Sequence, residues 1–201
     1  MRATLLAVAL GASACGGTLP PPPPPRGLVI ANATGEVVVV VKVKPPWYAT
    51  RGAITGKFRA AVPEYQAASG LLTKQFSFAD NGYFGGIYRW RERAIAERWF
   101  GPAWHERVRK LRGVEGDIRF IDVTRTLEGA LEPAAFEGPM VVAIAPGRLE
   151  RYVGASGLRA GYEGQGLVVS TWSDAGHAEA FLQGVEPIEW FATPVGLVNS
   201  R

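Results

Sequence analysis

The side chains best suited to chemistry gather in one stretch, GGIYRWRERAIAERWFGPAW, which runs from Gly85 to Trp104. It holds three tryptophans, and His105 follows it directly. Imidazole is the side chain whose ordinary pKa lies nearest to neutral pH. A histidine beside large aromatic rings could therefore take a proton from a flat organic molecule that the rings hold by stacking.

The candidate site residues follow from this chemistry. His105 is the candidate proton acceptor, because it is the only imidazole in the first half of the chain. Aromatic side chains of the same half are the candidate ligand-binding residues, namely Phe58, Tyr65, Tyr88, Trp90, Trp99 and Trp104. Each role has a simpler alternative, since aromatic residues at helical spacing usually form core and a helical histidine is often a surface residue.

The composition argues against two other kinds of site. One cysteine and two histidines cannot supply the four ligands of a structural zinc site, so we expect no metal. The net charge is +4, and acidic residues are interleaved among the arginines, which predicts a solvated surface and no nucleic-acid partner. A single cysteine also excludes an intrachain disulfide bond.

The start of the chain predicts export. Residues 1–14 carry a positive charge, a short apolar run and then small residues, as in a signal peptide. The following Cys15 is the only cysteine, and Ala12-Ser13-Ala14-Cys15 resembles a bacterial lipobox, which implies lipidation of Cys15. The alternative is plain cleavage after Ala14. We expect a lipid anchor in the bacterial cell envelope, at the outer membrane where there are two membranes, because Gly16 and not Asp follows the cysteine.

Residues 15–36 are expected to be a proline-rich linker behind the anchor. The run from Pro20 to Pro25 favours polyproline II, which would space a folded domain about 20 Å from a membrane. A disordered linker is the alternative.

The first half of the remaining chain predicts the order β-α-β-β-α-β over residues 37–127. Strands are expected at 37–43, 71–78, 83–90 and 117–123, with a helix after residue 50 and a helix over 92–111 that is interrupted at Gly101-Pro102. This is the order of a ferredoxin-like α+β unit, an antiparallel sheet with both helices on one face.

The second half, residues 138–201, repeats the order in shortened form. Trp90 aligns with Trp172, and Trp99 aligns with Phe181, but no counterpart of residues 102–111 follows. We therefore expect two tandem ferredoxin-like repeats of unequal length. Their sheets are expected to pack face to face within one chain, burying Val39, Val41, Val142 and Ile144, so that the protein is a monomer with an internal pseudo-dimer.

The first repeat resembles the YdhR-type monooxygenase family, which belongs to the antibiotic-biosynthesis-monooxygenase-like superfamily of dimeric α+β barrels. The resemblance is carried by SGLLTKQF (69–76), GGIYRW (85–90), AERWFGPAW (96–104) and the closing RFIDV (119–123). It implies an α+β barrel with a pocket between sheet and helices. It also implies oxidation of aromatic phenols without metal, flavin or other cofactor, because the first strand, VVVVVKV, lacks the Asn of the haem-degrading branch.

Two functions remain open at this point. One is a cofactor-independent oxygenase in the cell envelope that acts on a phenol or quinol. The other is a non-catalytic, lipid-anchored module that binds a small molecule or serves a structural role. The aromatic stretch of the first repeat favours the former, and the shortened second repeat favours the latter.

The lipobox generates one prediction. The protein made in a bacterium should incorporate a labelled fatty acid, and Cys15→Ser should abolish the incorporation because only this thiol can carry the lipid. A mature protein that begins at Cys15 but carries no lipid would contradict the assignment.

Overall fold

The computed structural model describes residues 18–23, 26–130, 133–187 and 189–199. The first half forms one ferredoxin-like unit from β2 (Val37–Val43), α1 (Arg51–Gln66), β3 (Leu71–Ala79), β4 (Phe84–Trp90), α2 (Arg93–Trp99), α3 (Pro102–Arg112) and β5 (Asp117–Asp122). Its strands lie side by side in the order β3-β4-β2-β5. This is the order expected of a ferredoxin-like sheet, so the prediction for this half is confirmed.

The second half repeats that arrangement with smaller helices. It consists of β7 (Ala134–Pro146), the 3₁₀ helix η1 (Leu149–Tyr152), β8 (Leu158–Gly164), β9 (Leu167–Trp172), α4 (Ala175–Leu182) and β10 (Glu189–Val198). The strand order β8-β9-β7-β10 matches that of the first half. The structure therefore confirms two tandem α+β repeats, of which the second is shortened.

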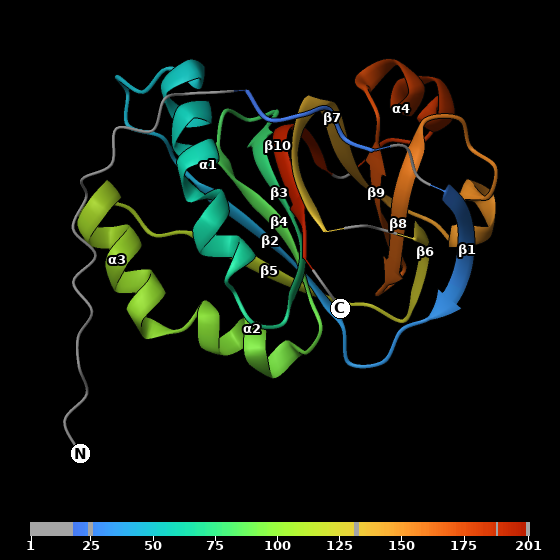
Figure 1. Ribbon diagram of the computed structural model, residues 1–201, viewed down its shortest axis with the longest axis horizontal. Coiled ribbons are helices and arrows are strands. Elements are labelled where there is room, and N and C mark those ends of the chain that lie inside the picture. The colour runs from blue at the N-terminus through green and yellow to red at the C-terminus, as the bar shows by residue number, and fades with distance from the viewer. Residues whose placement is uncertain (1–17, 24–25, 131–132, 188, 200–201) are drawn as a thin grey trace.

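The halves share one curled, ten-stranded antiparallel sheet, with α1–α3 outside one part of it and α4 outside the other (Figure 1). β10 pairs with β3 and joins the two units edge to edge. Two strands that the sequence patterns do not predict extend the sheet: β1 (Arg26–Asn32) pairs with β6 (Arg125–Ala130), and β6 pairs with β8.

Both faces of the sheet are covered, and this decides which side chains meet. Val38 and Val40 point inward and pack with Val142 and Ile144 of the other half. The expectation was right for Val142 and Ile144 but wrong for Val39 and Val41, which point outward to the helices. Because all five consecutive valines of β2 are buried, hydrophobicity alone does not reveal which face each residue occupies.

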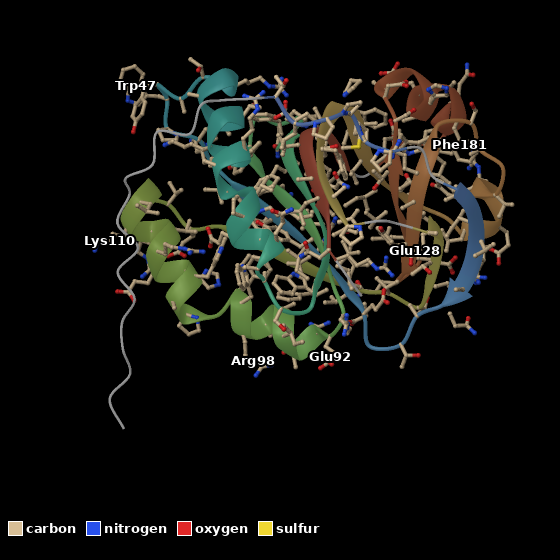
Figure 2. All side chains as sticks on the ribbon, viewed as in Figure 1. Trp47, Glu92, Arg98, Lys110, Glu128 and Phe181 are labelled. Carbon is tan, nitrogen blue, oxygen red and sulfur yellow. The ribbon has the colours of Figure 1, made fainter. Side chains whose placement is uncertain are left out.

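A buried ion network crosses the interior between the halves. Arg89 of β4 donates to Glu36 at 2.7 Å and makes a bidentate pair with Glu128 of β6. Figure 2 labels Glu128. Its guanidinium also lies 4.8 Å from the ring centre of Tyr162. The two carboxylates neutralise the charge of Arg89, a residue that is only 2% exposed, and the pair with Glu128 links β4 to β6.

The helix ends that frame the outer face of the first half follow from local sequence. Thr50 caps α1 by accepting a hydrogen bond from the Ala53 amide at 3.2 Å. Pro102 opens α3 in its first turn, and Gly113 ends it in the left-handed conformation with φ of 69°. These residues fix the ends of α1 and α3, the two helices that line the candidate site.

The expected linker is partly structured. Residues 26–32 form β1, and the Glu137 amide donates to the Pro20 carbonyl at 2.8 Å. The described prolines thus lie against β7 and do not extend away as a free spacer. Cys15 and the predicted signal lie outside the described residues. Within those residues, no helix is both long and apolar enough to cross a bilayer.

The shared inner core generates a prediction about assembly. Each half covers the inner face of the other, so the protein should sediment as a monomer at micromolar concentration. Sedimentation equilibrium measures this directly. A tight dimer in which the first-half sheets of two chains pack together would contradict the intramolecular barrel.

Candidate functional site

A cavity of about 200 Å³ lies between the first-half sheet and helices α1 and α3. Its wall is formed by side chains from β2, β3, β4 and the two helices. The lining residues are Val41, Val43, Ile54, Lys57, Phe58, Ala61, Tyr65, Lys74, Phe76, Phe84, Gly85, Tyr88, Trp104, Arg107, Val108 and Leu111. An apolar cavity of roughly 150 Å³ can hold a benzene ring, so this space suits a small aromatic molecule.

The structure brings four of the six candidate aromatic residues to this wall. Phe58 and Tyr65 reach it from α1, Tyr88 from β4 and Trp104 from α3. Trp104 is 7% exposed and packs edge-on against Phe100, with ring centres 5.5 Å apart. α3 has no counterpart among the described residues of the second half, so this part of the wall belongs to the first half.

Trp90 and Trp99 lie beside the cavity and do not line it. Their ring centres are 5.4 Å apart, and Trp90 is fully buried. The second half contains the equivalent pair, Trp172 and Phe181, at 5.0 Å. Since the pair recurs where α3 is missing, it serves the packing of sheet on helix that both units need. The core interpretation therefore explains these two residues.

His105 is placed at the surface and is not part of the cavity wall. Its side chain is 38% exposed, and Nδ1 lies 3.8 Å from a carboxylate oxygen of Glu115. Its ring meets that of Trp104 edge-on at 5.1 Å. His105 follows Trp104 on α3, and the helical turn that directs the indole to the cavity directs the imidazole away from it.

Lys74 is a buried charged residue of the cavity wall, and the sequence patterns do not single it out. It pairs with Tyr88 across β3 and β4 and is only 2% exposed. Its Nζ lies 2.9 Å from the ring centre of Tyr65, 3.9 Å from that of Phe76 and 4.4 Å from that of Tyr88. Within the described residues, no carboxylate lies within salt-bridge distance of this amine.

Strand alternation is the signal that would have found Lys74. Residues two apart in a strand share a face, so Lys74 shares one with Phe76 and Phe78. Both phenylalanines pack under α1, where their rings lie 5.1 and 5.3 Å from that of Phe58. A lysine on the helix-covered face of a sheet must be enclosed.

The enclosure changes the acid–base properties of the site. Burial lowers the pKa of Lys74 well below its usual value, while the charge of Glu64 raises this pKa and that of Arg107 lowers it. Burial also raises the pKa of Tyr65 and that of Tyr88, so both phenols stay protonated. The cavity therefore places an amine of lowered pKa beside two phenols that keep their protons, an arrangement that suits an acidic aromatic hydroxyl group.

The described residues contain no cluster of three or more His, Cys, Asp or Glu side chains that could hold a metal ion. The polar atoms at the cavity come instead from lysine, arginine and tyrosine.

Comparison with known proteins gives structural neighbours of similar fold and no named family. No family model matches the chain, and no curated protein matches it significantly. An anthrone oxidase-like protein has 16% identity and a TM-score of 0.46, over 86% of this chain and 96% of its own.

Two candidate monooxygenases are also similar. The one from Lactobacillus acidophilus has 9% identity and a TM-score of 0.43, and the one from Fusobacterium nucleatum has 8% and 0.47. Each alignment covers 82% of this chain and 94% of the other.

The buried amine generates a prediction about stability and pH. In the unfolded chain Lys74 binds a proton up to its ordinary pKa of about 10.4, whereas the folded protein releases that proton at lower pH. Over the interval between those two pKa values the unfolded state holds more protons, so the free energy of unfolding rises with pH, by at most about 1.4 kcal/mol per unit.

Lys74→Met removes this dependence. The variant should be more stable than the wild type at neutral pH, and its advantage should shrink as the pH rises towards the ordinary lysine pKa. Urea unfolding at several pH values measures the difference. Lys110→Met, a change at an exposed lysine of α3 (Figure 2), should show no such trend. An advantage that is constant with pH would mean that Lys74 is buried as an ammonium ion.

Proposed function

We propose that the chain is a cell-envelope lipoprotein whose first half binds a small aromatic phenol or quinol and oxidises it with dioxygen, without a metal or flavin. The observation that supports this most directly is the cavity of about 200 Å³, which is lined mainly by aromatic and aliphatic side chains. The first-repeat motifs and the lone Cys15 support kinship with YdhR-type monooxygenases and a lipid anchor, respectively.

The shape and lining of the cavity suit a ligand of one or two rings. Phe58, Tyr65, Tyr88 and Trp104 offer ring faces and edges for stacking. Lys57 and Arg107 also line the cavity, from α1 and α3, and Lys57 is exposed. Their charges attract an anionic or electron-rich ligand towards the site.

The chemistry requires an anion in a site with little water. A deprotonated phenol or enol is electron-rich enough to pass electrons to dioxygen, and the apolar wall limits access of water to the products. For a substrate with an activated CH₂ group, one atom of dioxygen becomes the carbonyl oxygen on that carbon. The other oxygen leaves as water with the two hydrogens, so no external reductant is needed.

The alternative is a module that binds the same class of ligand without turning it over. One observation favours it: among the described residues, the cavity wall contains no carboxylate and no imidazole. His105 lies outside the wall, so we assign it no contact with the ligand. Oxygen uptake with a panel of naphthols and quinols, measured aerobically with an anaerobic control, separates the two functions. Uptake that depends on ligand and protein supports the oxygenase, and binding without uptake supports the module.

The cavity itself is tested by filling it. Ala61 of α1 lines the cavity, and Ala61→Phe should place a ring inside it. We expect binding of a naphthol, measured by calorimetry, to weaken by at least about tenfold while the melting temperature stays the same or rises.

The matched control is Ala60→Phe, which adds the same ring at the neighbouring exposed position of α1, outside the wall. It should leave the affinity unchanged. Equal affinity of the wild type and Ala61→Phe would place the ligand elsewhere and remove the main support for this function.

A further inference from the structure

We propose that Lys74, which lines the cavity among three aromatic rings, is its acid–base group: the amine takes the proton of an acidic aromatic hydroxyl, and the ammonium ion so formed holds the aryl oxide. This inference rests on the proposed function, since it names the group that the ligand meets and the class of ligand that fits it. The substrate class is an ionisable aromatic alcohol or enol, as opposed to an aromatic ether or an aliphatic alcohol.

The geometry places the amine at the cavity, against aromatic rings and away from carboxylates. Its Nζ touches the faces of three aromatic rings, at distances of 2.9 to 4.4 Å, and has no carboxylate partner among the described residues. The ring faces can hold an ammonium ion by cation–π contact, but they offer it no hydrogen-bond acceptor as strong as an oxygen atom. Lys74 also lines the cavity. An oxygen atom of a ligand in the cavity would supply the missing partner.

The groups that face Lys74 from the neighbouring elements leave its proton affinity low. α1 contributes Glu64 and Tyr65, α3 contributes Arg107, and β4 contributes Tyr88. Glu64 and Arg107 pair with each other at 3.4 Å and are each about half exposed, so their opposite effects on Lys74 are weak. Burial therefore dominates, and it lowers the pKa of the amine.

Binding of the ligand reverses that balance. The hydroxyl O–H bond of the ligand breaks, its electron pair stays on oxygen, and the proton bonds to the lone pair of Nζ. A neutral pair becomes an ammonium–aryl oxide ion pair, in which the two charges attract strongly because the surroundings have a low dielectric constant. The rings of Tyr65 and Tyr88 flank Nζ, with ring centres 2.9 and 4.4 Å away, and both phenols keep their protons. An aliphatic alcohol is far too weak an acid for this transfer.

The test uses para-nitrophenol, which absorbs visible light only when ionised, and para-nitroanisole, its methyl ether, which cannot ionise. Each probe is titrated into the protein, and the absorbance of bound para-nitrophenol is followed against pH. We expect bound para-nitrophenol to ionise at least about one pH unit below the free compound, a tenfold change in the ionisation constant. The wild type should also bind it more tightly than para-nitroanisole.

Two variants assign the effect. Lys74→Met should still bind para-nitroanisole, but it should lose the lowered pKa of the bound phenol. Lys110→Met removes an exposed lysine of α3 outside the cavity wall and should keep the lowered pKa of the bound phenol. The wild-type titration tests the inference by itself even where Lys74→Met does not fold.

The possible failures are distinguishable. If neither probe binds, the proposed function fails and the inference fails with it. If para-nitroanisole binds but bound para-nitrophenol ionises no earlier than the free compound, the inference alone is overturned. Persistence of the lowered pKa in Lys74→Met overturns it as well, because another group would then hold the anion.

Discussion

The strand β2 must be covered on both of its faces, and the rest of the structure depends on this requirement. Its residues Val37–Val41 are at most 2% exposed. The inward valines are covered by the second half of the chain, and the outward ones are covered by α1 to α3. A strand that is apolar on both sides cannot stand at a water-facing sheet. The barrel formed between the repeats covers the inner face of β2, and the helical layer outside the repeats covers its outer face.

The helical layer of the first half leaves a space that its own packing does not fill. α3 extends the layer beyond the helix that the second half has in the same place, and it brings Trp104 over the sheet. Beneath α3, Lys74 of β3 lies on the same face of the sheet as Phe76 and Phe78 of that strand. Burying an amine against three rings opposes folding, and a residue that opposes folding while facing a cavity indicates a role in binding or chemistry.

Much of the fold could be predicted from the sequence, because hydrophobic period, glycine and proline mark the elements clearly. The helix α3 with Pro102 and Gly113 is an example. The patterns do not predict β1, because its apolar run Leu28–Ala31 lies in the stretch assigned to the linker, and because an edge strand with largely exposed side chains has no alternation of buried and exposed residues. In the site, aromatic residue type predicted four wall residues but could not separate them from Trp90 and Trp99. His105 has the right chemistry for a proton acceptor, but the sequence does not show which way a helical side chain points. Lys74 lies within an apolar strand, where the pattern of residue types does not mark it as a site residue.

The protonation state of Lys74 can be observed directly by NMR of protein labelled at the lysine side chains. The Nζ and Cε signals of each lysine are followed against pH in the protein without ligand, and Lys74→Met identifies the Lys74 signal. A neutral amine at the cavity predicts a pKa for Lys74 well below the value of about 10.4 that the exposed lysines show, together with a return to the ammonium form when para-nitrophenol is added. A Lys74 signal that titrates with the exposed lysines, and does not respond to the phenol, would contradict it.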